Sequence, residues 1–199
     1  MSATTTVPRR PECPRCMRAQ SACICAFAAP IASSIELLIL QHPMEVRAAK
    51  GTARLLHLSL PGSAIAVGES FDPDALRAML HAGDRTPVLL YPPSGDAPER
   101  FSPRQLQPSK IRLVVLDGTW RKSRKMLFQN PILQSLPRLA LEDLPASGYR
   151  IRKAHAAHQL STLEAAACAI VAIDPACDVQ PLLDGFDSFI NQQLTFAGR

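Results

Sequence analysis

The residues of this chain best suited to chemistry are Asp117 and the three that follow it, Gly118, Thr119 and Trp120. A largely apolar run over residues 111–116 precedes the acid and predicts a strand buried on both faces of a parallel sheet. Gly118 permits a sharp turn, and the Thr119 hydroxyl can cap a helix that begins at Trp120. Asp117 is therefore expected at the carboxyl end of a central strand, where open α/β sheets bind ligands. An isolated Asp-Gly pair more often only orders a turn.

The helix expected after this turn supports a ligand-binding role. It contains no acid before Pro131, and its first turns carry four cations, Arg121, Lys122, Arg124 and Lys125. A charge run is usually only a solvated face, but unpaired cations beside a ligand edge favour a phosphate-bearing partner. The whole chain has 22 Lys and Arg against 17 Asp and Glu, a net charge of +5, which also favours a polyanion.

Four cysteines near the N-terminus form a second candidate site. Cys13 and Cys16 are separated by two residues, and Cys23 and Cys25 by one. The first spacing brings two thiolates to one tetrahedral ion, and four thiolates complete a closed structural zinc site. Free thiols, a redox pair and an iron–sulfur centre are the alternatives. The full ligand count in so short a span favours zinc.

Polar residues also stand at two other predicted element ends. A strand over residues 35–41 ends before His42 and Glu45, although a His in such a place is as often a hydrogen-bonded loop residue as a functional one. Ser161 and Glu164 form a capping box at the start of an almost wholly apolar helix over residues 163–173. Capping alone would explain both of these side chains.

Two loops complete the set of candidates. A strand over residues 86–91 ends in a loop that contains Pro92 and Ser94, small residues that allow a ligand to approach the backbone, although most such loops are merely turns. The polar loop before Ser161 carries one aromatic and three cations, Tyr149, Arg150, Arg152 and Lys153. Its cations are candidates for contact with an anionic partner.

The elements that must position these residues alternate along the chain. Strands are expected over residues 35–41, 63–67, 86–91, 111–117 and 137–141, and helices over 73–81, 120–130, 163–173 and 182–196. Residues 33–199 are therefore predicted to form an α/β domain whose mostly parallel sheet is flanked by helices, after a leader and cysteine knuckle over residues 1–32. The last helix is expected to use Phe186, Phe189, Ile190 and Leu194 as core or dimer contacts.

Membrane and secretory classes are not indicated. No apolar run approaches the roughly 18–20 residues of a spanning helix, and the first ten residues lack the apolar centre of a signal peptide. A cytoplasmic protein without membrane contact is expected.

The ordered motifs together resemble the DTW-domain family of tRNA-uridine aminocarboxypropyltransferases, from Cys13 to about Val171. The resemblance rests on the four cysteines, His42-Pro43-x-Glu45, Leu116-Asp117-Gly118-Thr119-Trp120, Tyr149-Arg150-x-Arg152-Lys153 and Leu160-Ser161-Thr162-Leu163-Glu164-Ala165. The chain departs from the family where Gly51-Thr52 replaces the common Asn-Thr, and in the loop from Pro92 to Ala97. These departures concern substrate contacts more than the reaction class.

The resemblance implies transfer of the 3-amino-3-carboxypropyl group of S-adenosylmethionine to N3 of a tRNA uridine, with methylthioadenosine released. It also implies kinship with the SPOUT class, which leaves room for a knotted C-terminal half although knots are rare. Monomer and homodimer both stay open. Asp117 is the expected base, because a uridine imino nitrogen is a poor nucleophile until its proton is removed.

The other site residues are assigned to two groups on the strength of the resemblance. The donor is expected to contact Pro92, Ser94, Leu116, Gly118, Thr119, Trp120, Ser161, Thr162 and Glu164. The RNA is expected to contact His42, Glu45, Arg121, Arg124, Lys125, Tyr149, Arg150, Arg152 and Lys153. Trp120 could stack on the target base or on adenine, although an aromatic at a helix start is as often part of the core.

Two other functions compete with this one. An S-adenosylmethionine-dependent RNA methyltransferase would use the same pocket and leave S-adenosylhomocysteine as its co-product. A non-catalytic, zinc-containing RNA-binding module would need only the basic patches and the knuckle. The second alternative gives no reason for Asp117 at a ligand edge.

Overall fold

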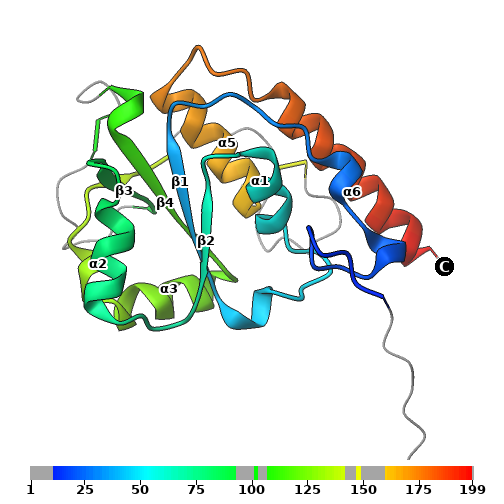
Figure 1. The fold of residues 1–199 in the computed structure, drawn as a ribbon, viewed down its shortest axis with the longest axis horizontal. Helices are drawn as coiled ribbons and strands as arrows, with labels where there is room; N and C mark the ends of the chain where they lie inside the picture. The colour runs from blue at the N-terminus through cyan, green and yellow to red at the C-terminus, as the bar shows by residue number, and fades with distance from the viewer. Residues whose placement is uncertain (1–10, 93–100, 103–106, 142–146, 149–159, 199) are drawn as a thin grey trace, which may run out of the picture.

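The computed structural model describes residues 11–92, 101–102, 107–141, 147–148 and 160–198 of the chain (Figure 1). In this part of the protein, one sheet holds five strands, all parallel, in the order β2-β1-β4-β3-β5. The strands are β1 (Glu36–Gln41), β2 (Ala64–Val67), β3 (Thr86–Leu90), β4 (Ile111–Asp117) and β5 (Arg138–Leu139). The predicted α/β class and parallel sheet are confirmed.

Helices cover both faces of the sheet (Figure 1). One face packs against α1 (Ala53–Ser59), α5 (Thr162–Ile173) and α6 (Gln180–Ala197). The other packs against α2 (Pro73–His81), α3 (Trp120–Gln129) and the short α4 (Pro131–Gln134). None of the helices in the described ranges combines the length and the apolar character needed to cross a bilayer.

The middle residues of β1 (37–40) and of β4 (113–116) are all apolar because both faces of these strands are covered. In β1, Leu37 and Ile39 belong to the core under α1 and α5, whereas Leu38 and Leu40 belong to the core under α2 and α3. The residues of β4 alternate in the same way, and β4 lies between β1 and β3. This arrangement fixes Asp117 at the carboxyl edge of a central strand, as predicted.

Side-chain caps begin three of the helices, and two of these caps, Thr119 and Ser161, were predicted. Asp72 accepts hydrogen bonds from the backbone N–H groups of Asp74 and Ala75 at the start of α2. Thr119 accepts from Lys122 N at the start of α3, and Ser161 begins α5 with a complete capping box. Side-chain oxygens satisfy amide groups that have no partner inside the helix, so these signals act over a few residues only.

The segment between β1 and β2 forms a short 3₁₀ turn, η3 (Pro43–Glu45), and then α1, with a loop around Gly51 between them. Strand β5 pairs only with Leu89 and Leu90 of β3 and is shorter than expected. Because Pro92 has no backbone N–H to donate, it cannot continue that ladder.

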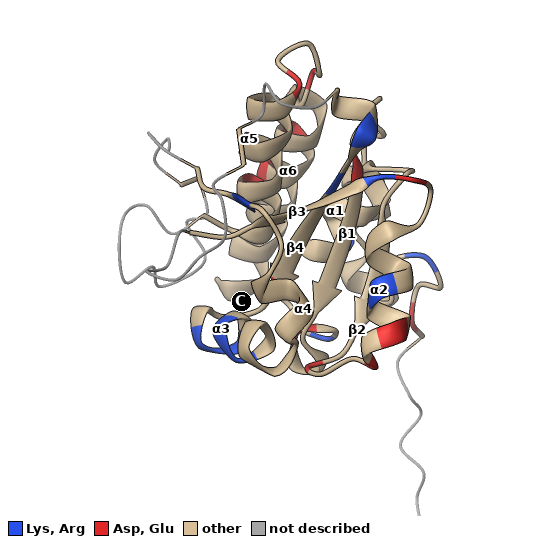
Figure 2. Ribbon diagram, turned by 90° about the vertical axis from the view of Figure 1, so that its left-hand side faces the viewer, with Lys and Arg blue, Asp and Glu red and all other residues tan. Residues whose placement is uncertain are grey.

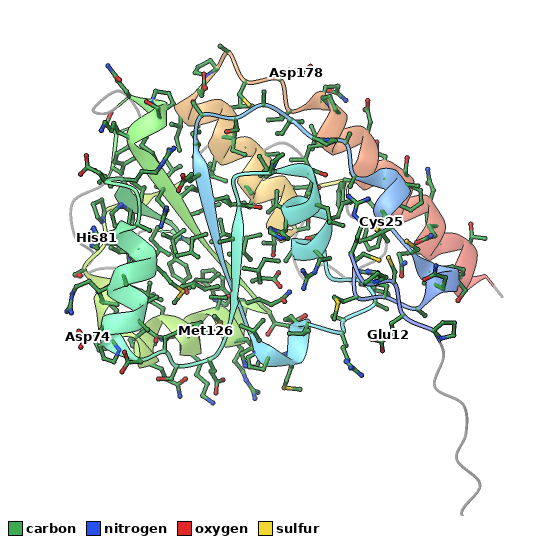
Figure 3. The ribbon with its side chains drawn as sticks, viewed as in Figure 1. Glu12, Cys25, Asp74, His81, Met126 and Asp178 are labelled. Atoms are coloured by element: carbon green, nitrogen blue, oxygen red, sulfur yellow. The ribbon has the colours of Figure 1, made fainter. Side chains whose placement is uncertain are left out.

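The N-terminal segment lies on α6, where its second 3₁₀ turn, η2 (Cys25–Phe27), touches the helix backbone. A Cβ atom added to Gly185 would stand 2.1 Å from the carbonyl oxygen of Phe27. Phe186, Phe189 and Ile190 are buried as predicted, but Leu194 is 41% exposed and belongs to the surface of the last turn. Figure 3 shows Cys25 at this junction.

Candidate active site

The carboxylate of Asp117 is the point at which three elements meet. Its side chain is buried, with 5% of the residue exposed. Oδ2 accepts a hydrogen bond of 2.8 Å from Nε2 of Gln41, the last residue of β1, and Oδ1 accepts one of 2.7 Å from the hydroxyl of Thr162, the first residue of α5. These two donors hold the carboxylate in one orientation. A carboxylate has about four lone-pair sites, so they leave it further accepting capacity.

A cavity of about 120 Å³ opens beside this carboxylate. Its walls come from the η3–α1 loop, the end of β4 and the start of α5, and they consist of Glu45, Ala48, Lys50, Gly51, Thr52, Asp117, Gly118, Ser161 and Thr162. Sites that enclose a complete drug-sized ligand are commonly about 300–1,000 Å³. The described residues therefore surround a space suited to one small polar part of a larger ligand.

The cavity presents charges of both signs. Glu45 and Asp117 supply carboxylates, Lys50 supplies an ammonium group, and the first turn of α5 directs the positive end of its dipole toward the cavity. Lys122 of α3 reaches back to Glu45, with 2.8 Å between Nζ and Oε1. This arrangement is complementary to a zwitterion such as a free α-amino acid group.

The capping box of α5 supports the cavity from behind. Glu164 Oε2 accepts from Ser161 N at 2.7 Å, and Glu164 Oε1 accepts from Gly148 N at 2.8 Å. The Ser147 hydroxyl also donates to this carboxylate. Glu164 is thus a buried anchor for two segments and does not line the cavity. Among the predicted site residues, Ser94, Tyr149, Arg150, Arg152 and Lys153 lie outside the described residues.

His42 is placed beside the cavity walls without lining the cavity. Its Nδ1 accepts from Met44 N, so the hydrogen-bond pattern assigns the ring proton to Nε2, which donates to Glu69 Oε1 at 2.9 Å. The other oxygen of Glu69 accepts from Lys125 Nζ. The hydrogen bond from Lys125, followed by that from His42, lowers the pKa of Glu69. His42 therefore ties the end of β1 to the residues that follow β2.

Besides Glu164, four described residues that were predicted to bind the donor do not line the cavity. Leu116 is buried in the core under α2 and α3, and Thr119 caps α3. Pro92 is exposed, and its carbonyl accepts from Arg138. Trp120 is 56% exposed, so the alternative that it belongs to the core is wrong. Gly118, Ser161 and Thr162 do line the cavity.

Several residues of the site were missed in the sequence. Gln41 donates a hydrogen bond to Asp117. The only sequence feature that could have indicated this contact is an amide side chain at the end of an apolar strand. Thr52 is buried and accepts from Leu163 N at 3.3 Å, which joins α1 to α5. Lys50 stands in the loop after η3, where no local pattern marks it as a wall of the cavity.

The four N-terminal cysteines are brought together as predicted. Their sulfur atoms all lie within 4.8 Å of one another, with Cys13 Sγ 3.6 Å from Cys25 Sγ and Cys16 Sγ 3.8 Å from Cys23 Sγ. Zinc–thiolate bonds of about 2.3 Å in a tetrahedron place the sulfurs about 3.8 Å apart. The spacing therefore fits one metal ion and is tighter than a cluster of several irons requires.

Local geometry also favours metal binding by this knuckle. The backbone N–H groups of Cys16 and Arg15 lower the pKa of Cys13 to about 6, whereas burial and the neighbouring thiols raise the pKa of Cys25 to about 12. A bound cation would remove the mutual repulsion that disfavours several thiolates at once. All four positions are cysteine, so a bound ion would have four protein ligands and no open coordination position. Such a site is structural.

The chain is similar to known proteins over most of its length. Residues 10–194 match the family described as DTW domain. Proteins named tRNA-uridine aminocarboxypropyltransferase 2 are 31% identical over 185 residues in Macaca fascicularis and 30% over 182 residues in Mus musculus, and each alignment covers 88% of this chain and 60% of the relative. The Drosophila melanogaster protein of that name is 31% identical over 181 residues, which cover 71% of its length. No solved structure matches the chain.

Proposed function

Because the chain belongs to the DTW-domain family, we propose that it transfers the 3-amino-3-carboxypropyl group of S-adenosylmethionine to N3 of a uridine in tRNA. The chain spans about 60% of the length of the two mammalian relatives, whose names specify tRNA, uridine and the aminocarboxypropyl group. The observation that carries the proposal is the cavity beside Asp117, which offers both signs of charge within a small volume.

The donor fits this cavity through its amino acid end. Its ammonium group would face the carboxylate of Glu45, and its carboxylate would face Lys50 and the start of α5. The adenosine end is too large for the same space and would extend beyond the described walls. In this pose, the methylene carbon next to the sulfonium lies between the amino acid group and the open side of the cavity.

We assign the proton transfer to Asp117. The carboxylate would accept the N3 proton of the uridine while N3 attacks the methylene carbon, and the carbon–sulfur bond would break with its electron pair left on sulfur. A neutral thioether, methylthioadenosine, would leave, and Asp117 would release the proton to solvent. Holding base, nucleophile and electrophile in line provides much of the acceleration in such reactions.

The positive charge of α3 supports RNA as the substrate. Figure 2 shows Lys and Arg positions, in blue, gathered along this helix, which begins three residues after Asp117. Cations at this place favour a polyanion beside the cavity. A base that reacts at N3 must be unpaired, so a loop or a flipped-out uridine is the expected target.

The fold relationship and the metal belong to the same proposal. The parallel sheet supports kinship with the SPOUT class only at the level of α/β architecture. Most of the chain between β5 and α5, which a C-terminal knot would involve, lies outside the described residues. We also propose that the four cysteines hold structural zinc, which would fix the N-terminal segment on α6.

The decisive test is mass spectrometry of nucleosides from tRNA incubated with the purified protein and S-adenosylmethionine. Aminocarboxypropyluridine together with methylthioadenosine is the expected result. A methylated nucleoside with S-adenosylhomocysteine would replace the proposal by a methyltransferase. Binding of tRNA without any new nucleoside and without donor binding would reduce the protein to an RNA-binding module.

A further inference from the structure

Helix α3 displays two large aromatic side chains to solvent. Trp120 is 56% exposed and Phe128 is 59% exposed. Arg124 lies between them in sequence, and its guanidinium carbon is 5.6 Å from the centroid of the Phe128 ring. Residues four apart on a helix are neighbours on one face, so these three side chains form a continuous row, the α3 stripe, about 12 Å long.

Core packing of α3 does not use this row. The opposite face of α3 already supplies the core contacts through Ser123, Met126 and Leu127, and Figure 3 shows Met126 between the helix and the sheet. An exposed helix face normally carries charged and small polar groups. Two exposed aromatic rings on one such face mark a surface for a partner with flat apolar faces.

Trp120 is held ready for such a partner. Its ring stacks on Tyr91 at the end of β3, with 5.2 Å between centroids and 12° between planes. Tyr91 itself is buried. One face of the indole is thus supported by the protein, and this support reduces the ordering cost of stacking a further ring.

The charges on this helix favour RNA as that partner. Lys122 is paired with Glu45, and Lys125 with Glu69. Within the described ranges, no carboxylate forms an ion pair with Arg121 or Arg124, and both are exposed. Aromatic rings that stack on bases, interleaved with Arg groups near phosphates, are the usual means of binding single-stranded nucleic acid.

We infer that the α3 stripe binds unpaired nucleotides next to the target uridine, with bases stacked on Trp120 and Phe128 and phosphates near Arg121 and Arg124. The inference rests on the proposed function for the identity of the RNA and goes beyond it by placing neighbouring nucleotides. The stripe starts three residues from Asp117. Its length matches about three or four stacked bases.

The test compares Phe128→Ala, Phe128→Tyr and the control Phe196→Ala, which removes a ring 38% exposed near the end of α6. Binding of unmodified tRNA transcripts would be measured by fluorescence anisotropy at fixed salt, without donor. Phe128→Ala should weaken binding about five- to fiftyfold, Phe128→Tyr should retain most of it, and Phe196→Ala should bind as the wild type does. Arg124→Gln should reduce the slope of log K against log salt concentration by about one, as expected for the loss of one phosphate contact.

Equal affinity of Phe128→Ala and the wild type would overturn the inference. So would a fall in oligomeric mass for Phe128→Ala in sedimentation with its RNA affinity unchanged, since the stripe would then join two copies of the chain. A different result would contradict the proposed function without contradicting this inference. If the wild type binds tRNA through Phe128 but forms no aminocarboxypropyluridine, the inference stands and the reaction does not.

Discussion

The hydroxyl of Thr162 donates a hydrogen bond of 2.7 Å to Oδ1 of Asp117, although 45 positions separate the two residues in the chain. This bond joins the first residue of α5 to the last residue of β4. Since Ser161 and Glu164 fix the first turn of α5, the capping box also sets where the proposed base points. The motif that starts α5 therefore also positions the proposed base.

Replacement of Thr162 by Val should therefore slow the transfer step. The substitution keeps the shape of the side chain and removes the donor, so one oxygen of Asp117 loses its constraint. We expect kcat to fall about 10- to 100-fold and the free energy of unfolding to fall by only about 1 kcal/mol. Thr162→Ser retains the hydroxyl and should retain most of the activity. Wild-type kcat for Thr162→Val would show that this bond has no part in the reaction.

Replacement of Asp117 by Asn separates two roles of the carboxylate. The amide fills the same space next to Gln41 and Thr162 but cannot take the uridine proton. Transfer should fall by at least about a hundredfold at neutral pH, as expected for the loss of a general base. Donor binding, measured by calorimetry, should change by much less. If donor binding is lost together with activity, the carboxylate holds the donor ammonium group and the base lies elsewhere.

Features set by short stretches of sequence were predicted well. Apolar runs gave the strands because both faces of β1 and β4 are covered, and Asp72, Thr119 and Ser161 act on amides a few residues away. The cysteine pairs were recognisable because ligand spacing is itself local. Residue types and spacing were sufficient in each of these cases.

Features that depend on contacts between distant segments were not predictable. Ala48 and Gly51 form part of the cavity wall only because the loop after η3 lies against the start of α5. The ring of Trp120 stacks on Tyr91, the residue that follows β3. The type of a residue does not indicate which distant segment will lie next to it. The sequence therefore predicted the edge of the sheet at which the candidate site lies, but not all the residues that form the site.

Replacement of Cys25 by Ser should remove the metal from the knuckle. Three thiolates bind zinc much more weakly than four, and the apparent melting temperature should fall by about 5–10 °C as the N-terminal segment loosens. Elemental analysis of the purified variant should show less than one zinc per chain. Cys168→Ser, on α5 and outside the cluster, is the matched control and should keep its zinc. Absence of zinc from the wild type would refute the assignment of the metal.

Replacement of Gly185 by Ala should destabilise the contact between η2 and α6. The new methyl group would meet the carbonyl oxygen of Phe27 at 2.1 Å, so the two segments must separate. We expect a loss of about 3 kcal/mol in the free energy of unfolding, although Ala is otherwise favoured in helices. Gly198→Ala is a suitable control, because its nearest neighbour would be 3.7 Å away. Chemical denaturation of both variants measures the difference, and equal stabilities would contradict this close packing.

Replacement of Arg18 by Lys should show that the cysteine knuckle supports the cavity. The Arg18 guanidinium lies 5.0 Å from the centroid of the Phe189 ring and donates to the carbonyl oxygens of Ala49 at 2.6 Å and Gly51 at 2.8 Å. Lys cannot donate to both carbonyls with the same planar fork, so the loop that forms one cavity wall should shift. We expect KM for the donor to rise about 5- to 20-fold with a smaller change in kcat, because the proposed role of this wall is donor binding and not proton transfer. Arg47→Lys, at an exposed position 4.0 Å from Glu12, should leave both constants unchanged. If Arg18→Lys lowers the melting temperature but leaves KM at the wild-type value, Arg18 stabilises the fold without positioning the cavity wall.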